Sequence, residues 1–211
     1  MRSDYLERYE IKRVGGSLHE EYWIPAEDLD AFNDAILWGH ITVIDAFIQG
    51  DDGQPVPAFT LTGFDHGGVW DAVYERLSFK PSTDRNKWPV WNVDGPSTVF
   101  SFEWPGADPA LEIMNRTLDE AALDAMRRVV PPGNSFVSLD WQHETFEVWP
   151  LAMSRISEPL PTPILPNGDY YLHVDSDLRF GFLGQPWEAT ITVFGSELMD
   201  AFEAPPFLAR S

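Results

Sequence analysis

The alternation of hydrophobic and polar residues divides this chain into many short strands and a few helices. Apolar and polar side chains alternate with the two-residue period of a half-buried strand near the start of the chain, at 9–14, and again at 99–104. After residue 134 we expect five further strands separated by short turns, at 135–141, 145–149, 169–174, 178–183 and 189–194. Consecutive strands joined by short turns are typical of an antiparallel sheet.

Helical spacing of apolar residues appears between these strands. Pro25 and the acidic residues after it predict a helix start, and further helices are predicted from Trp70 to Leu77 and near 196–202. Thr117-Leu118-Asp119-Glu120 has the form of a capping box, so we expect a helix to begin there and to end before Pro131. Five prolines between Pro150 and Gly168 predict an extended strap that crosses the surface.

These elements predict an α+β protein, with a largely antiparallel sheet backed by a few helices. A small N-terminal ββαββ-like block is expected over residues 1–66, and a main α+β domain over 67–211, because a helical pattern begins near Gly67-Gly68. Hydrophobic residues make up 44% of the chain, which is enough to fill a core.

The net charge of the chain argues against some classes of binding partner. With 34 acidic and 14 basic residues, the formal charge is −20, which argues against nucleic-acid or membrane partners. There is no cysteine, so disulfides and thiolate metal sites are excluded. No signal sequence or membrane-spanning run is recognisable, and we therefore expect a cytoplasmic protein.

One cluster of residues with chemical potential lies between two predicted strands, at 139–144. Asp140, His143 and the neighbouring Gln142 could orient one another as a general base and its partners, with Trp141 beside them. The alternative interpretation is a hairpin turn with an anchoring tryptophan.

Two further clusters surround later predicted strands. The first contains Asp169 and Tyr171, followed by His173, Asp175 and Asp177, whose side chains have the ligand types of a divalent-ion site. The alternative is that Asp175-Ser176-Asp177 forms a hairpin turn. We favour the turn and expect no metal and no cofactor. The second cluster consists of Arg179, Gln185, Trp187 and Glu188. Glycines and a proline in this cluster predict a tight turn at which a ligand can approach the backbone.

Catalytic signatures are absent from the sequence: there is no Gly-x-Ser-x-Gly, His-Glu-x-x-His or Walker motif, and the five histidines do not have zinc-site spacing. The nine tryptophans either line a ring-binding cleft or belong to the core.

Several ordered motifs resemble a bacterial family known as domain of unknown function 2716. They include Trp70 to Pro81, Val130 to Gly133, Leu139 to His143, Pro166 to Tyr171 and Phe180 to Glu188. The family has no known activity. Its pattern has a histidine before Pro-Trp-Glu where this chain has Gln185, which weakens any mechanism that uses a pair of histidines. The segment from Tyr22 to Asn33 is similar to short tails on bacterial polymorphic-toxin and immunity polypeptides.

The leading hypothesis is a binding protein rather than an enzyme, immunity-like, whose acidic face occupies a basic partner such as a toxin domain. Charge would speed the encounter, and aromatic side chains would supply affinity. The alternative is a small enzyme or ligand-binding domain with a pocket around Asp140, His143, Asp169, Tyr171, Trp187 and Glu188. A third hypothesis is an acidic mimic of nucleic acid, which would require carboxylates in rows.

Overall fold

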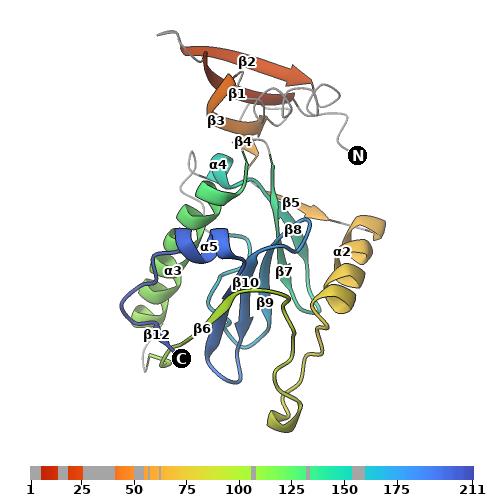
Figure 1. Ribbon diagram of the computed structural model, residues 1–211, viewed down its shortest axis with the longest axis vertical. Coiled ribbons are helices and arrows are strands. Elements are labelled where there is room, and N and C mark those ends of the chain that lie inside the picture. Colours follow the sequence, from red (N-terminus) through yellow and green to blue (C-terminus); the bar gives the residue numbers. More distant parts are fainter. Residues whose placement is uncertain are drawn as a thin grey trace.

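A computed structural model of the protein describes residues 6–13, 19–25, 41–49, 55–56, 58–61, 63–105, 108–131, 134–153 and 160–211. Within these residues the strands form two antiparallel sheets (Figure 1). The smaller sheet has the strand order β2 (His19–Pro25), β1 (Leu6–Arg13), β3 (Ile41–Gln49) and β4 (Pro55–Val56). The helix predicted after Pro25 falls outside the described residues.

The larger sheet has eight strands, and every neighbouring pair is antiparallel. Its order is β12 (Ala209–Arg210), β6 (Ser97–Ser101), β11 (Thr190–Phe194), β10 (Gly181–Gln185), β9 (Tyr171–Asp175), β7 (Phe136–Asp140), β8 (Thr145–Val148) and β5 (Ala58–Leu61). The predicted α+β class with a largely antiparallel sheet is therefore confirmed.

The chain passes from the smaller sheet to the larger one before Ala58. β5 pairs with β8, and helix α2 (Gly63–Arg76) continues through Gly67 and Gly68 without a break. Strand β5 ends at Leu61, because the helix already begins at Gly63. The division into domains 1–66 and 67–211 stays a prediction.

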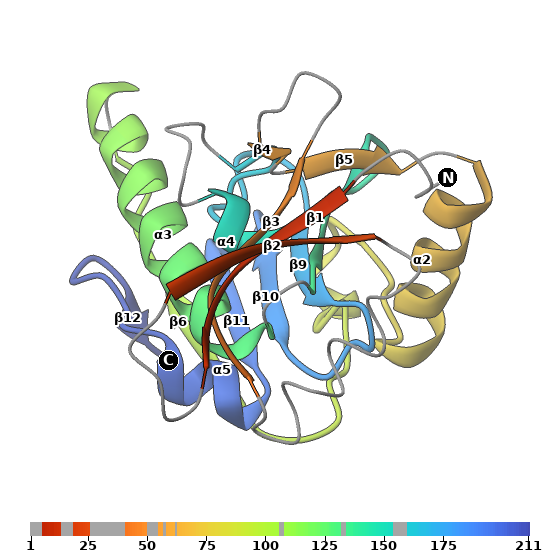
Figure 2. The ribbon, with the colours of Figure 1, turned by 90° about the horizontal axis from the view of Figure 1, so that it is seen from above.

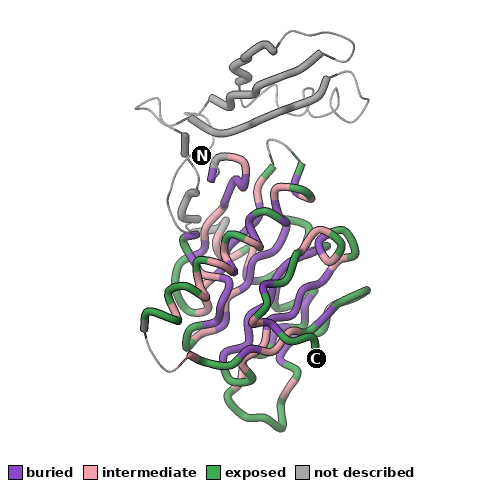
Figure 3. The backbone as a smooth tube through the Cα atoms, turned by 90° about the vertical axis from the view of Figure 1, so that its left-hand side faces the viewer, coloured by how far each residue is buried: buried purple, intermediate pink, exposed green. Residues whose placement is uncertain are grey.

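Helices cover both faces of the larger sheet (Figures 1 and 2). One face is covered by α3 (Asp108–Val129), α4 (Pro150–Met153) and α5 (Ser196–Ala201). The other face is covered by α2 and by the segment that follows it, which includes the short 3-10 helix η2 (Arg85–Lys87). Each face has its own cluster of buried apolar side chains. Buried residues are therefore concentrated in the central strands of the sheet (Figure 3).

Helix α3 begins at Asp108, well before the capping box predicted at Thr117-Leu118-Asp119-Glu120. That prediction was wrong, because the four residues lie inside the helix. Pro109 is compatible with a first helical turn, and Leu111 and Met114 extend the apolar stripe towards Leu118 and pack against the core. The packing of Leu111 and Met114 therefore decides where the helix begins, and the capping signal at Thr117 does not.

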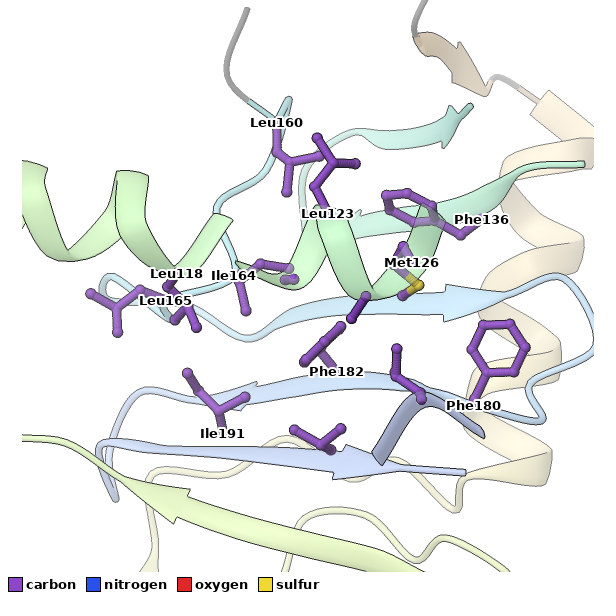
Figure 4. Close-up of a cluster of buried hydrophobic side chains, with 14 of the residues drawn as sticks. Leu118, Leu123, Met126, Phe136, Leu160, Ile164, Leu165, Phe180, Phe182 and Ile191 are labelled. Atoms are coloured by element: carbon purple, nitrogen blue, oxygen red, sulfur yellow. The ribbon is translucent and has the colours of Figure 1, made fainter. Parts of the chain in front are cut away.

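The proline-rich strap also differs from its prediction. Its first residues form α4, and the part from Leu160 to Gly168, called the strap below, has no helix or strand. Pro161, Asn167 and Gly168 are exposed, but Leu160, Ile164 and Leu165 are buried in the apolar cluster that α3 and the sheet share (Figure 4). Burial of these apolar side chains stabilises the strap against the core, although its prolines cannot donate to a sheet.

In the hairpin between β9 and β10, the second strand starts later than predicted. Strand β10 begins at Gly181, whereas the alternation of residues predicted a start at Leu178. Leu178 has a positive φ of 54° and its amide donates to the carbonyl of Asp175 (2.9 Å), so it belongs to the turn. The turn interpretation of Asp175-Ser176-Asp177 is confirmed.

Candidate functional site

Three side chains, those of Asp140, His143 and Asp169, form what we call the acidic corner, at one end of the larger sheet. Asp140 is the last residue of β7, Asp169 lies two residues before β9, and β7 pairs with β9 so that Asp140 stands opposite Tyr171. His143 Nδ1 lies 3.0 Å from Asp140 Oδ1 and 3.9 Å from Asp169 Oδ2. Strand pairing thus joins two candidate clusters that are separate in the sequence.

A tight turn holds His143 over the two carboxylates. The amide of His143 donates to the carbonyl of Asp140 (3.1 Å), and Gln142 takes a positive φ of 71° to close the turn. The amide of Trp141 donates to the carbonyl of Tyr170 (3.1 Å), which fixes the turn to the segment that carries Asp169. The position of the imidazole is therefore set by backbone hydrogen bonds on both sides.

The surroundings of the acidic corner shift the pKa values of His143, Asp169 and the adjacent Tyr171. The hydrogen bond with Asp140, followed by the charge of Asp140, raises the pKa of His143. Partial burial raises the pKa of Asp169, and the nearby Asp140 carboxylate adds to this. Burial, with the charges of Asp140 and Asp169, also raises the pKa of the Tyr171 phenol. Tyr171 therefore belongs to the same electrostatic environment, in its neutral form.

Asp140→Asn is expected to lower the pKa of His143 towards the ordinary histidine value, because Asp140 is the main source of its shift. Asp169→Asn should have a smaller effect, since Asp169 lies farther from Nδ1. NMR titration of the His143 ring measures both, with Asp177→Asn, on the β9–β10 turn, as the control. An unchanged His143 titration in Asp140→Asn would show that this hydrogen bond is not formed in solution.

Aromatic side chains adjoin the acidic corner. Trp141 Nε1 lies 3.3 Å from the Tyr74 hydroxyl and is placed to donate to it, and Tyr74 is 44% exposed on α2. The Trp141 ring also contacts the buried Tyr170 ring edge-on, with centroids 5.7 Å apart. Partly exposed aromatic rings therefore lie beside the carboxylates of the acidic corner. The contacts of Trp141 with Tyr74 and Tyr170 hold these rings in place.

Gln185, Trp187 and Glu188 lie at the same end of the sheet as the corner, on the turn between β10 and β11. The pairing of Gly184 with Tyr171 brings this turn beside the start of β9. Gln185 is buried and accepts a hydrogen bond from the amide of Trp187 (3.3 Å), whereas Trp187 is 45% exposed. In the described part of the chain, no hydrogen bond or ion pair joins these residues to the three side chains of the corner.

A shallow groove of about 620 Å³ lies along this turn. It is lined by Arg85, Trp88, Pro89, Glu188 and Thr190. The loop wall is firmly held, because Trp88 Nε1 donates to the carbonyl of Ser82 (2.8 Å) and the Tyr170 hydroxyl contacts both the carbonyl and the amide of Ser82. The loop residues of this groove were not among the candidates from the sequence. The signal that could have found them is the presence of Trp88 and Trp91 in a polar segment, because linkers seldom contain tryptophan.

The remaining candidate, Arg179, lies at the opposite end of β9. Its Nε donates to Asp175 Oδ2 (2.8 Å), in a pair that closes the β9–β10 turn. His173 is fully buried on the face covered by α3, whereas Asp177 is exposed on the turn. His173, Asp175 and Asp177 therefore do not gather into a common site.

The acidic corner has the ligand types of a divalent metal site. One oxygen of Asp140, one of Asp169 and one nitrogen of His143 all lie within 4.8 Å of one another. Carboxylate and imidazole ligands suit ions such as Zn²⁺ or Mn²⁺. The same geometry suits a lysine or arginine side chain of a partner, because such a side chain can donate hydrogen bonds to both carboxylates.

The fold and the corner define an α+β domain with a polar surface site at one end of an antiparallel sheet. The chain belongs to the family described as "Protein of unknown function (DUF2716)", whose pattern matches residues 60–199. It is also similar to "Uncharacterized protein YxiI" of Bacillus subtilis (strain 168), with 37% identity over 97 residues, which are 44% of this chain. The matched part spans 60% of the length of that relative. No solved structure matches significantly.

The family match includes the acidic corner, the groove and the strap. None of the helices in the described part of the chain is both long enough and apolar enough to cross a membrane.

Proposed function

We propose that this protein binds a basic partner protein and that the acidic corner is where the partner docks. The observation that carries the proposal is the pair of carboxylates, Asp140 and Asp169, which share one imidazole. Among the described residues, no lysine or arginine forms an ion pair with either carboxylate. A lysine or arginine of the partner would find two acceptors there.

The surroundings of the corner support the same proposal. Trp141 and Tyr74 supply aromatic surface beside the carboxylates, and aromatic residues are frequent anchors in protein interfaces. The chain carries a formal charge of −20, which would accelerate the encounter with a basic protein and weaken the complex at high salt. The partner class that we favour is a basic toxin domain, which would make this a cytoplasmic, immunity-like protein.

The test is a comparison of variants as bait in lysate of the source organism. The wild-type protein should retain a basic protein at about 50 mM salt and release it at about 500 mM. Asp140→Asn with Asp169→Asn should retain at least tenfold less, equivalent to about 1.4 kcal/mol of binding free energy. Asp177→Asn with Asp200→Asn removes the same charge from exposed positions elsewhere and should behave like the wild type.

Equal retention by the two double variants would reject the acidic corner as the docking point, even if net charge still mattered. Failure of the wild-type bait to retain any basic protein would reject the proposed function itself.

A second function, a small enzyme or ligand-binding domain, is favoured by the hydrogen bond between Asp140 and His143. A carboxylate that holds one nitrogen of an imidazole leaves the other nitrogen available as an acid or base. His143 is 58% exposed, so a substrate can reach it from solvent. His143→Gln distinguishes the two functions, because it should abolish acid–base catalysis and leave the two docking carboxylates in place.

A further inference from the structure

The strap is held in place by one of its peptide groups. His173 Nε2, from β9, lies 3.1 Å from the carbonyl oxygen of Pro163, and the amide of Ile164 donates to Asp119 Oδ1 of α3 (2.8 Å). This carbonyl and this amide belong to the same peptide bond. The sheet, the strap and the helix are therefore joined by one continuous chain of hydrogen bonds.

The imidazole at one end of this chain is in an environment that suits its neutral form. His173 is fully buried, and its neighbours on the flanking strands are Ser138 and Phe136 on β7 and Phe182 on β10. The strap itself, 160–168, contains no ionisable side chain. A neutral ring protonated at Nε2 satisfies the Pro163 carbonyl, and burial lowers the pKa of His173 to about 4.

The carboxyl group at the other end also has features that suit its neutral form. Burial is the main cause that raises the pKa of Asp119 to about 7, and the carboxylate of Glu120 contributes, while the bond from Ile164 opposes the shift. Asn115, one helical turn earlier on α3, has a buried side-chain oxygen without a partner among the described residues. Residues four apart lie on the same face of a helix, so this oxygen is on the Asp119 side of α3.

We propose that the Pro163–Ile164 peptide group is a charge-compensated latch, closed by neutral His173 and neutral Asp119. In the open strap, under mildly acidic conditions, the imidazole is protonated and the carboxyl group is ionised. Closing the strap then removes one proton from the imidazolium and adds one to the carboxylate, with no net exchange of protons with solvent. The stability of the closed strap therefore changes little with pH.

The sign of each contribution follows from linkage. His173 binds its proton more weakly when buried, so its contribution to stability falls as the pH drops from about 6.5 towards 4. Asp119 binds its proton more tightly when buried, so its contribution falls as the pH rises from about 4 towards 7. Between pH 4 and 6.5 the two slopes are opposite, and they offset each other.

The strap that carries the latch runs directly into Asp169 of the acidic corner. Because the pH effects of His173 and Asp119 offset each other, the strap would hold Asp169 in position across a range of pH. This consequence for partner binding depends on the proposed function, whereas the latch does not.

Two single variants and their combination test the latch. Asp119→Asn keeps an oxygen for the Ile164 amide, and His173→Gln keeps a donor for the Pro163 carbonyl. We would measure the unfolding equilibrium constant of each variant relative to the wild type by urea denaturation at pH 4.5 and 6.5. The relative constant should fall roughly 60-fold between these pH values for Asp119→Asn and rise roughly 40-fold for His173→Gln. The double variant should show the pH dependence of the wild type.

Relative constants that do not change with pH, or that change in the same direction in both single variants, would overturn the proposal. NMR of the wild-type protein supplies a test that does not depend on the folding of the variants. The His173 ring should remain neutral and protonated at Nε2 at pH 5.5, and a ring that titrates near pH 6.5 would contradict the latch.

Discussion

Gly181→Ala is expected to destabilise the protein by about 3 kcal/mol or more, because β10 has no room for a side chain at its first residue. A Cβ atom at this position would lie 2.4 Å from the carbonyl oxygen of His173 and 2.8 Å from Val174 Cγ1. Both obstacles belong to β9, the neighbouring strand in the middle of the sheet, so relief requires the two strands to separate. Urea denaturation measures the loss.

Gly68→Ala is the matched control for this substitution. Gly68 lies inside α2, is exposed, and would place its Cβ where no other atom lies within 4 Å. Alanine favours a helix more than glycine does, so this variant should gain about 0.5–1 kcal/mol. A Gly181→Ala protein with the stability of the wild type would show that β9 and β10 are not packed as closely as described.

Asp175→Ala is expected to cost about 2–4 kcal/mol of stability. The side chain of Asp175 is buried at the end of β9, where Oδ1 accepts from the amides of Arg179 and Phe180 and Oδ2 accepts from Arg179 Nε. Alanine would leave these amides without their side-chain acceptor in the turn that starts β10. Asp175→Asn retains one acceptor oxygen and should be intermediate.

Asp177→Ala is the control for the turn, since the Asp177 side chain is 73% exposed and lies 3.8 Å from the same Arg179 nitrogen. Exposed pairs of this kind contribute little, so the change should stay within about 0.5 kcal/mol. If Asp175→Ala were as mild as Asp177→Ala, the contacts of the buried carboxylate would not be essential to the hairpin.

The strands of the larger sheet were largely predictable from their apolar runs and the short turns between them. The predictions for 135–141 and 189–194 agree with β7 and β11 to within one residue at each end, because short apolar runs bounded by turns are typical of strands that are buried on both faces. The start of α3 was not predictable in this way. Thr117 and Glu120 carry a capping signal, but Leu111 and Met114 pack against the core and extend the helix backwards.

The acidic corner was only half visible in the sequence. Asp140 and His143 are close in the chain, so a turn that joins them could be expected, whereas Asp169 reaches them only through the pairing of β7 with β9. No pattern in the sequence indicated that His173 and Asp119 would bind the Pro163–Ile164 peptide group. Asp119 was interpreted as part of a helix start, and His173 as a strand residue that could be a metal ligand. Burial of their side chains depends on a strap that was expected on the surface.

The sequence by itself determined the α+β class, the antiparallel character of the sheet, the acidity of the chain and the family pattern. These properties depend on composition and on periodicities of two to four residues, which neighbouring positions encode. The tertiary structure decided that Asp140, His143 and Asp169 meet, that the strap is buried, and that His173 and Asp119 hold one peptide bond between them. Those contacts join residues far apart in the chain, and they follow from strand pairing and core packing, which local patterns do not specify.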